Sequence, residues 1–413
     1  MVLRKKVCID LRCLQIGHES RGIGMHARSI LERLEDREDL QYIFYTFEGS
    51  DPVIDNDIRV SVPYTIVTTP AVKKSIDRPQ DFFEVAKIVW HRYKPLQKNK
   101  PDIFLQFDFM LGMPRWKQTK TILIAYDLIP LLLHDEYLPT PLAAFRQAKG
   151  ILLKFKKLLR AAYYRFRYHL HYREFSKADR IISISKDTAH SLTSLLGIPQ
   201  EKITVAQLAP VFSTKKARAV PALKNISAPY FFYIGATDSR KRSQDLIAAY
   251  ERLREENYDI RLVLAGKEFA DVDEIPNLEV REAITSSCYR EGIICLGYVD
   301  DQEKLWLNQH AFAFVFPTLH EGFGLPVLEA MQSGCPVISY SNSSIPEIAG
   351  TAAILTKNEK SESLEKAMKD LLDNPSLRHS YVTRGREQAK NFSWERHMEL
   401  LLKTMYSLTS QFR

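Results

Sequence analysis

The sequence of 413 residues lacks several features that mark particular classes of protein. No window holds the roughly 18 or more apolar residues that a membrane-spanning helix needs, and the longest candidate, 121–133, is interrupted by Asp127 and Pro130. The five cysteines include no C-x2-C pair, so the sequence indicates neither a disulfide framework nor a zinc site. Residues 1–6 lead straight into a strand pattern without the apolar core of a signal peptide, and we therefore expect a cytoplasmic protein.

The sequence also lacks the aromatic stacking platforms and recognised modules of nucleic-acid-binding proteins, so we expect no nucleic-acid partner. It does have a formal net charge of +8 and a pI near 9.0, which favour an anionic partner such as a nucleotide or a membrane surface. Hydrophobic residues make up 45% of the chain, enough for large cores, and the length favours about two or three domains.

One stretch, residues 311–340, carries the strongest local signal. An apolar run at 311–316 has the character of a strand that is buried on both faces of a parallel sheet. Pro326 suits the first turn of a helix, which we expect over about 326–333. Gly322 and Gly324 lack side chains, so a ligand can approach the loop backbone next to the unpaired N–H groups of that helix. The pattern predicts an anion cradle.

Two carboxylates flank this cradle. Glu321 precedes the expected helix and Glu329 lies inside it. A phosphate alone would not favour carboxylates, whereas sugar hydroxyls donate charge-assisted hydrogen bonds to them. The alternative is that Glu321 is a solvated loop residue and that Glu329 is only a favourable charge in the first turn of the helix.

The run from 311 to 340 resembles the E-x7-E signature of retaining GT-B glycosyltransferases, above all family four. The resemblance implies an α/β fold, GT-B, in which two Rossmann-like α/β/α domains face each other across a cleft and a C-terminal helix crosses back to the first domain. It also implies that Glu321 contacts the donor sugar and that Glu329 binds the ribose. By the same resemblance, the backbone at Phe323, Gly324 and Leu325 holds sugar and diphosphate oxygens.

Strand and helix signals alternate in both halves of the chain, which favours two α/β domains independently of the resemblance. We expect an N-terminal acceptor-side domain at 1–212 and a linker at 213–228, where prolines and lysines replace strand signals. A C-terminal nucleotide-sugar-binding domain follows at 229–390. We expect a crossover helix at 391–413 that packs on the N-terminal domain.

A basic loop at 235–242 follows an expected strand and matches the family's loop in which an Arg-Lys pair contacts the donor diphosphate. The resemblance gives this role to Arg240 and Lys241, whose charges would offset the charge that develops on the leaving nucleoside diphosphate. A solvated basic loop is the alternative.

A second loop, 297–304, resembles the one that meets the nucleobase, and the resemblance implies contacts from the Val299 backbone and the Asp301 carboxylate. The residues leave another interpretation open with equal weight, in which Asp300 and Asp301 only cap the helix that follows.

In the first half of the chain, Gly22 and Gly24 stand between an expected strand at 7–11 and a helix from Met25. The third glycine of a dinucleotide site is missing, and a tight turn is the alternative; the resemblance places both glycines beside the donor phosphates. Tyr126 and Asp127 end an expected strand, at the edge where open parallel sheets bind ligands. Many family members have His-Asp there, so Tyr126 is a departure, and a packed tyrosine without a role fits equally.

Two short acidic patterns, at 55–57 and 271–273, fit the loose Asp-x-Asp motif with which glycosyltransferases of another fold hold a metal. Neither follows a buried strand beside the other motifs, so we interpret both as surface loops. We expect no cofactor and no essential metal.

The expected function is transfer of a hexose from a nucleoside diphosphate sugar to a hydroxyl of a glycan or lipid-linked glycan, in cell-surface polysaccharide or glycolipid biosynthesis. Retention at the anomeric carbon is implied by the resemblance alone. GDP-mannose is the favoured donor, because guanine presents adjacent N–H groups that one carboxylate such as Asp301 accepts together. A UDP-sugar-dependent enzyme of the same fold and a non-catalytic sugar-nucleotide-binding relative are the alternatives.

Residues 141–175 form a basic segment, and no acidic residue occurs from Tyr137 to Arg173. Apolar residues recur there at spacings of three and four, namely Phe145, Ala148, Leu152, Phe155, Leu159, Ala162 and Phe166. A core helix with a solvated basic face is one interpretation. The interleaved tyrosines and cations favour the other, a helix that binds the anionic inner face of the cell membrane.

Overall fold

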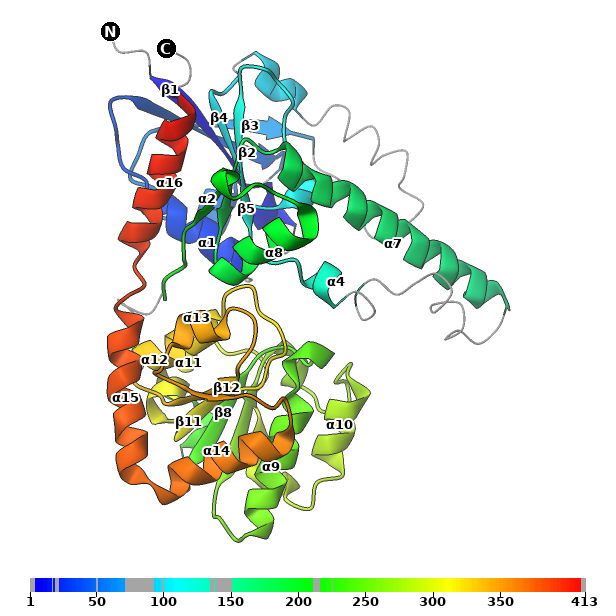
Figure 1. The fold of residues 1–413 in the computed structure, drawn as a ribbon, viewed down its shortest axis with the longest axis vertical. Helices are drawn as coiled ribbons and strands as arrows, with labels where there is room; N and C mark the ends of the chain where they lie inside the picture. The colour runs from blue at the N-terminus through cyan, green and yellow to red at the C-terminus, as the bar shows by residue number, and fades with distance from the viewer. Residues whose placement is uncertain are drawn as a thin grey trace. The chain divides into compact units, whose positions relative to one another are not determined.

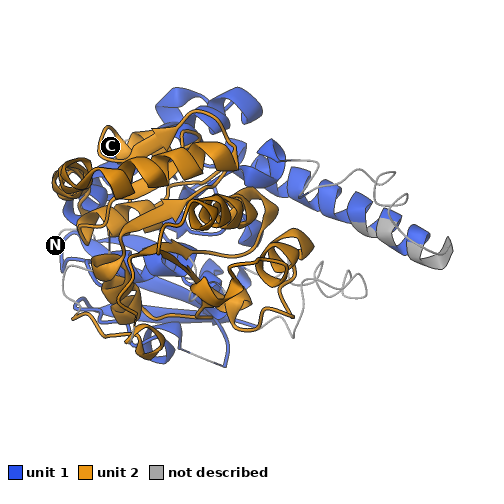
Figure 2. Cartoon of the chain, turned by 90° about the horizontal axis from the view of Figure 1, so that it is seen from below, with its two compact units in different colours: residues 1–206, 394–413 blue, residues 207–393 orange. Residues whose placement is uncertain are grey.

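The computed structural model describes residues 4–16, 18, 22–49, 51–70, 93–98, 100–133, 137, 151–210, 216–224 and 226–409. The chain divides into two compact units (Figure 2). Unit 1 comprises residues 1–206 and 394–413, and unit 2 comprises residues 207–393. The expected boundaries at 212 and 390 fall close to these divisions, and residues 216–224, which we expected in a linker, belong to unit 2.

Unit 1 is built on a seven-stranded parallel sheet with the order β3-β2-β1-β4-β5-β6-β7. Its strands are β1 Lys5–Asp10, β2 Leu40–Phe47, β3 Tyr64–Thr69, β4 Ile103–Gln106, β5 Lys120–Ala125, β6 Arg180–Ser183 and β7 Ile203–Val205. Its described α-helices are α1 Gly22–Leu31, α2 Pro52–Asp55, α4 Ile129–Leu132, α7 Ile151–Lys177, α8 Lys186–Leu196 and α16 Trp394–Thr409. The central strands β4 and β5 are almost wholly buried, as continuous apolar runs in a parallel sheet should be.

Unit 2 is built on a six-stranded parallel sheet with the order β10-β9-β8-β11-β12-β13. Its strands are β8 Tyr230–Ile234, β9 Arg261–Ala265, β10 Ile293–Cys295, β11 Ala313–Phe316, β12 Val337–Tyr340 and β13 Ile354–Thr356. Its helices are α9 Ser243–Glu255, α10 Leu278–Thr285, α11 Asp301–His310, α12 Leu325–Gln332, α13 Ile345–Ala349, α14 Ser361–Asp373 and α15 Pro375–Ala389. The two Rossmann-like sheets confirm the expected α/β fold class.

The last helix, α16, belongs to unit 1 although it follows unit 2 in the sequence (Figures 1 and 2). Its apolar face is buried through Met398, Leu401 and Met405. Near its end, the Tyr406 hydroxyl donates to Asp39 Oδ2 at 2.7 Å. The expected return of the chain to the first domain is therefore confirmed.

Helix α7 extends away from the sheet of unit 1 as a long rod (Figure 1). Its C-terminal part is anchored, because Tyr172 and Phe175 are buried against Phe109. The part of the expected basic segment at 141–150 lies outside the described residues. Across the described ranges, we find no helix with both the length and the apolar character needed to cross a membrane.

Candidate active site

The centre of the candidate site in unit 2 is an ion cluster around Glu321, in the loop after β11. Glu321 Oε1 accepts hydrogen bonds from Arg240 Nη1 at 2.9 Å and from Lys241 Nζ at 2.5 Å. The Thr318 hydroxyl donates to the same oxygen at 2.8 Å. The side chains of Glu321 and Lys241 are each 12% exposed, so the ion cluster is largely shielded from solvent. The three residues predicted to act on the sugar and the diphosphate thus lie together.

The electrostatics of this cluster shift the pKa values of Glu321 and Lys241, and they favour an ionised Glu321. Burial raises the pKa of Glu321, but the nearby charges of Lys241 and Arg240 outweigh burial and leave the pKa below its ordinary value. Burial lowers the pKa of Lys241; Arg240 adds to this effect, and Glu321 opposes it. Lys241 Nζ also lies 4.7 Å from the centre of the Phe316 ring, which favours a cation at that position.

Two loops that are distant in the sequence are tied together to build the cluster. The Leu319 N–H donates to the Arg240 carbonyl at 2.7 Å, and Arg240 Nη1 donates to the His320 carbonyl at 2.6 Å. Ser344, just before α13, donates to the carbonyl oxygens of Glu321 and Phe323. Sequence reasoning missed this serine, because nothing in its local pattern distinguishes it from a polar loop residue.

The backbone beside Glu321 has the character of an anion cradle. Gly324, with a φ of +99°, forms the N-cap of α12, and a Cβ there would lie 2.8 Å from Ile345 Cδ1. The positive φ favours a glycine here, whereas the contact is with the far end of the flexible Ile345 side chain, which could shift. Within the described ranges, no hydrogen bond uses the N–H groups of Phe323, Gly324 or Leu325. These amides and the end of the helix dipole are available to an anionic ligand.

Glu329 is 2% exposed, and both of its carboxylate oxygens lie 3.0 Å from Lys304 Nζ. Asp301 Oδ1 lies 3.3 Å from the same nitrogen. Burial lowers the pKa of Lys304, but Glu329 and Asp301 outweigh burial and raise the pKa above its ordinary value. Lys304 was not predicted from the sequence, although its position three residues after Asp301 on a helix was the available signal.

Asp300 and Asp301, the acidic pair in the loop at 297–304, have different surroundings. Asp300 is the N-cap of α11 and forms a capping box with Glu303, and it also pairs with Arg218. Asp301 is the first residue of the helix, and its side chain is 34% exposed. Val299 is partly buried beside them. Capping therefore accounts for Asp300, and a contact of Asp301 or Val299 with a base stays a prediction.

In unit 1, Tyr126 and Asp127 follow β5 at the carboxyl edge of the sheet, where the pattern placed them. Asp127 Oδ1 accepts from the Ile129 N–H at 3.0 Å, at the start of α4. Tyr126 is partly buried, and burial together with the nearby Cys13 and Asp108 raises the pKa of its hydroxyl. Its hydroxyl lies 2.8 Å from His26 Nδ1. Sequence reasoning missed this histidine, which is 100 residues away from Tyr126 in the chain.

The glycine pair of unit 1 is placed differently from the prediction. Helix α1 begins at Gly22 rather than at Met25, so Gly22 and Gly24 lie in its first turn and not in a preceding loop. Among the described residues, a Cβ at Gly22 would meet no atom within 4 Å, so none of those neighbours requires a glycine there. Of the preceding loop, residues 17 and 19–21 lie outside the described residues.

A second acidic group stands at the same edge of the unit 1 sheet. Asp108 is 5% exposed, and its Oδ2 lies 3.6 Å from His18 Nε2. Burial raises the pKa of Asp108, partly against the hydrogen bond that it accepts from the Met110 N–H. Beneath it, the buried Asp10 and Arg12 form an ion pair at 2.5 Å. Asp10 ends β1, Arg12 and His18 follow it, and Asp108 follows β4; none of them was predicted.

Metal ligands do not converge in the part of the chain that the structure describes: no three His, Cys, Asp or Glu side chains are grouped as an ion would need. Of the acidic patterns, Asp55 ends the short helix α2, and Asp271 accepts from the Asp273 N–H at 3.0 Å. The expectation that no metal is essential stays a prediction.

Comparison with known families identifies both halves of the chain. Residues 216–388 match the family described as Glycosyl transferases group 1, and residues 20–207 match Glycosyltransferase Family 4. The chain is a GT-B glycosyltransferase of the group 1 and family 4 type. The family membership inferred from Glu321 and Glu329 is thereby confirmed, and retention at the anomeric carbon stays a prediction.

Two curated relatives of this glycosyltransferase are named as mannosyltransferases. O-antigen chain mannosyltransferase B of Escherichia coli is 32% identical over 226 residues, which are 53% of this chain and 58% of the relative. The serotype-specific mannosyltransferase WbdA of Escherichia coli is 25% identical over 292 residues, 69% of this chain and 33% of the relative. The matched part of the chain therefore spans between a third and three fifths of the length of these relatives.

Solved structures agree on the fold. Sucrose-phosphate synthase from Thermosynechococcus elongatus has a TM-score of 0.70 at 16% identity, covering 98% of this chain and all of that one. Anabaena HepE, solved in complex with UDP and glucose, has a TM-score of 0.66 at 14% identity, with 98% of this chain and all of that one covered. At these identities the likeness establishes the GT-B fold.

Proposed function

We propose that this glycosyltransferase transfers a hexose, with mannose favoured, from a nucleoside diphosphate sugar to a hydroxyl of a glycan or lipid-linked glycan, in the synthesis of a cell-surface polysaccharide. The observation that carries the proposal is the cluster of Glu321, Arg240 and Lys241 beside the amides of 323–325. Cations and open amides suit the diphosphate, and the carboxylate suits sugar hydroxyls. A site for a simple phosphate would need the cations and the amides but not the carboxylate.

The arrangement gives the two cations and the carboxylate different roles during transfer. Without a ligand, Arg240 and Lys241 both pair with Glu321, whose single negative charge offsets one of the two positive charges. A bound diphosphate offers the cations stronger partners, and their charge is most useful when the bond between the sugar and the diphosphate breaks. Glu321 Oε1 is then released toward the sugar. The E-x7-E resemblance further supports a reaction with retention at the anomeric carbon and without an essential metal.

The donor that we propose is GDP-mannose. Mannose is supported by the names of the relatives, and guanine is supported by the partly exposed Asp301 carboxylate, which can accept from adjacent N–H groups. A UDP-sugar is the second candidate, because the HepE structure is a complex with UDP and glucose.

A panel of GDP-, UDP- and ADP-sugars tests this proposal by thermal shift and by competition for binding. The expected result is the largest stabilisation by GDP-mannose, with GDP displacing the sugar nucleotide more effectively than UDP. A preference for UDP contradicts the donor assignment but not the enzyme class. Binding without transfer to any mannoside acceptor favours the non-catalytic alternative. Anomeric NMR of the product and assays with EDTA test retention and metal independence.

We further propose that α7 holds the enzyme against the anionic cytoplasmic face of the cell membrane. Four large apolar side chains of α7 are exposed, Phe155 by 55%, Leu159 by 66%, Phe166 by 66% and Leu170 by 45%. At 100° per residue they fall within about 60° of one another, so they form one stripe along the helix. The core-helix interpretation therefore fits only the anchored C-terminal part of α7.

Cations border this stripe on both sides. Lys154 and Arg165 lie about 80–100° beyond one edge of the stripe, and Lys156 and Arg167 lie about 40–60° beyond the other edge. An apolar stripe between two rows of cations matches the interface of an anionic bilayer, where each basic residue contributes about 1 kcal/mol. A lipid-linked acceptor would then be found at the same surface.

Liposome flotation with neutral and anionic vesicles, at low and high salt, tests this membrane proposal. One variant changes Lys154, Lys156, Lys157 and Arg160 to Glu, and a second changes the four apolar residues of the stripe to Ser. The matched control changes the exposed Lys357, Lys360, Lys366 and Lys403 to Glu. Recovery with anionic vesicles should fall in both test variants only. Equal recovery with neutral and anionic vesicles, or salt-dependent dimers in solution lost in the Ser variant, contradicts the proposal.

A further inference from the structure

A chain of hydrogen bonds runs through the interior of unit 1 to the Tyr126 hydroxyl. The hydroxyl lies 2.8 Å from His26 Nδ1, on α1. His26 Nε2 lies 2.9 Å from His397 Nε2, on α16. His397 Nδ1 lies 3.1 Å from the Ala206 carbonyl oxygen, just after β7. Three elements that are far apart in the sequence are thus joined to one residue at the carboxyl edge of the sheet.

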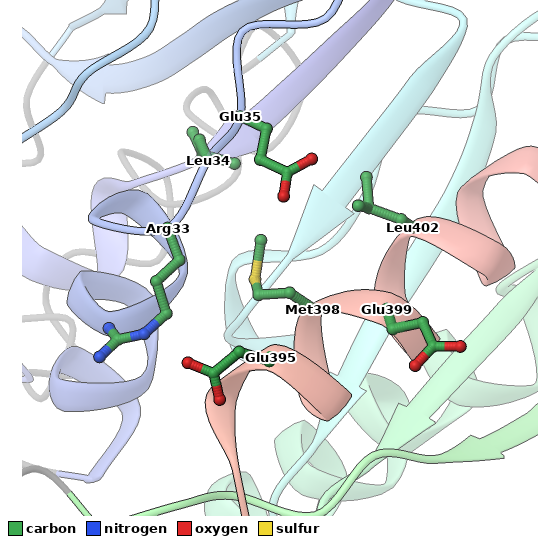
Figure 3. Close-up of a pocket in the computed structure, with 7 residues that line it drawn as sticks. All are labelled: Arg33, Leu34, Glu35, Glu395, Met398, Glu399 and Leu402. Atoms are coloured by element: carbon green, nitrogen blue, oxygen red, sulfur yellow. The ribbon is translucent and has the colours of Figure 1, made fainter.

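The two histidines are sealed from water. Each is 1% exposed, and the rings of Phe107 and Trp394 pack against His26. The hollow beside α16, about 500 Å³ in volume, is lined by residues that include neither histidine (Figure 3). Its lining residues are Arg33, Leu34, Glu35, Glu395, Met398, Glu399 and Leu402.

The positions of the protons follow from the last link of this chain. A carbonyl oxygen has no proton, so His397 Nδ1 must carry one and donate it to Ala206. In a neutral ring, His397 Nε2 then accepts, and His26 Nε2 donates to it. His26 Nδ1 is left as an acceptor, so the Tyr126 hydroxyl must donate its single proton to His26.

The neutral state of the pair has a physical basis. Burial and the neighbouring His397 lower the pKa of His26 well below its ordinary value. A proton added to the pair would reverse the chain, because a doubly protonated His397 would donate to His26. The titratable groups near the Tyr126 end are the Asp108 carboxyl and the neutral thiol of Cys13, and the charged Arg33 lies over the Trp394 ring at the other end.

We propose that His26 and His397 are positioning residues that hold the Tyr126 hydroxyl as a hydrogen-bond acceptor for a sugar hydroxyl. The proton of Tyr126 is used in the bond to His26, so the hydroxyl can offer a ligand only the lone pairs of its oxygen. The sugar hydroxyl in this inference rests on the proposed function. A tyrosine held in this way favours a ligand group that donates a hydrogen bond. It disfavours an analogue with a methoxy group or a hydrogen atom in place of that hydroxyl.

Measuring the tautomers of His26 and His397 tests the chain of hydrogen bonds without any assay of activity. The full-length protein is labelled with 15N at histidine, and long-range proton–nitrogen spectra are recorded at pH 7.5. His26→Asn and His397→Asn assign the two rings. We expect His397 to carry its proton on Nδ1 and His26 to carry its proton on Nε2. The opposite tautomers, or two averaged rings, overturn the proposal.

Transfer kinetics test the role of the chain in binding. With GDP-mannose and an octyl mannoside as probes, Tyr126→Phe and His26→Leu should each raise the acceptor KM about threefold to tenfold, the effect of one hydrogen bond. The double variant should be no worse than either single variant. His26→Asn, which keeps an acceptor near the Nδ1 position, should recover most of the loss, and the exposed His190→Asn serves as control. If the losses of the two single variants add in the double variant, or if only kcat falls, the histidines serve only to hold α16 in place.

The two measurements separate the two possible failures. If no sugar nucleotide supports transfer, the proposed function fails, and the tautomers still decide the proton chain. If transfer occurs and the tautomers are reversed, the positioning role fails alone. A His26→Leu variant that does not fold leaves Tyr126→Phe and the tautomers as the deciding evidence.

Discussion

The two candidate sites are held together by different kinds of interaction. In unit 2 the site consists of charges that are already compensated, with Glu321 between two cations and Lys304 between two carboxylates. In unit 1 the site residue Tyr126 rests on a neutral chain of imidazoles. Removing one member of a compensated pair leaves a buried charge, whereas removing one member of a neutral chain leaves only a missing hydrogen bond. The two sites should therefore respond to substitution on different scales.

Glu329→Gln should give the largest effect on stability. The variant removes the more buried of the two carboxylates that pair with Lys304, and breaking a buried pair from one side costs about 3 to 5 kcal/mol. Urea unfolding measures this loss. Binding of GDP should weaken as well, because we predict that Glu329 holds the ribose.

The double variant Lys304→Met with Glu329→Gln separates the two effects of the first prediction. Removing both charges should restore most of the stability, because the buried charge is gone. Nucleotide affinity should stay low. If stability and affinity recover together, Glu329 is a structural residue and does not hold the ribose.

The second largest effect should fall on turnover. Glu321→Gln, Arg240→Ala and Lys241→Ala each remove a charge-assisted contact worth about 1.5 to 3 kcal/mol, which corresponds to a loss of roughly 10- to 150-fold in kcat. Expression and melting temperature should change less than turnover. Lys369→Ala is the matched control, because it removes an exposed cation that pairs with Glu256 far from this loop. Wild-type turnover in all three variants contradicts the assignment of the cluster.

The same contrast explains what could be predicted from the sequence. The unit 2 site was predicted from local patterns, since 235–242 and 321–329 each place chemistry-bearing residues at fixed spacings on a loop before a helix. Parallel strands bring such loops to one edge of the sheet, which is why Arg240 and Glu321 meet; the family resemblance supplied their separate roles toward the diphosphate and the sugar, and the contact between them was not predicted. The start of α1 was misplaced, because glycines in a first turn have the same pattern as glycines in a loop.

The supports of the unit 1 site could not be predicted in this way. His26 and His397 are 371 residues apart, and each lies on a helix where a histidine has no distinctive pattern. Their contact exists only because α16 packs on the first unit. Lys304 and Ser344 were missed for a related reason, since their role depends on which loop or helix lies beside them.

The stability of unit 1 should depend on pH through His26. Its pKa is lowered in the folded protein by burial and by His397, so the unfolded chain binds a proton that the folded chain does not. The contribution is complete above the unfolded pKa of about 6.5 and is lost as the pH falls below it, by at most about 1.4 kcal/mol per pH unit. Melting temperatures at pH 7.5, 6.5 and 5.5 measure this slope. His26→Asn should flatten it, and an equal slope in that variant contradicts the neutral pair.

The smallest effects should distinguish the adjacent Asp300 and Asp301. Asp300→Ala removes the N-cap of α11 and should cost about 1 kcal/mol of stability, with little change in the affinity for GDP. Asp301→Asn keeps the helix capped and should weaken GDP relative to UDP, because the amide cannot accept the adjacent N–H groups of guanine together. Urea unfolding and competition binding on both variants provide the comparison. If Asp301→Asn binds GDP and UDP in the wild-type ratio, the carboxylate serves only Lys304, and base selection must come from elsewhere in the loop.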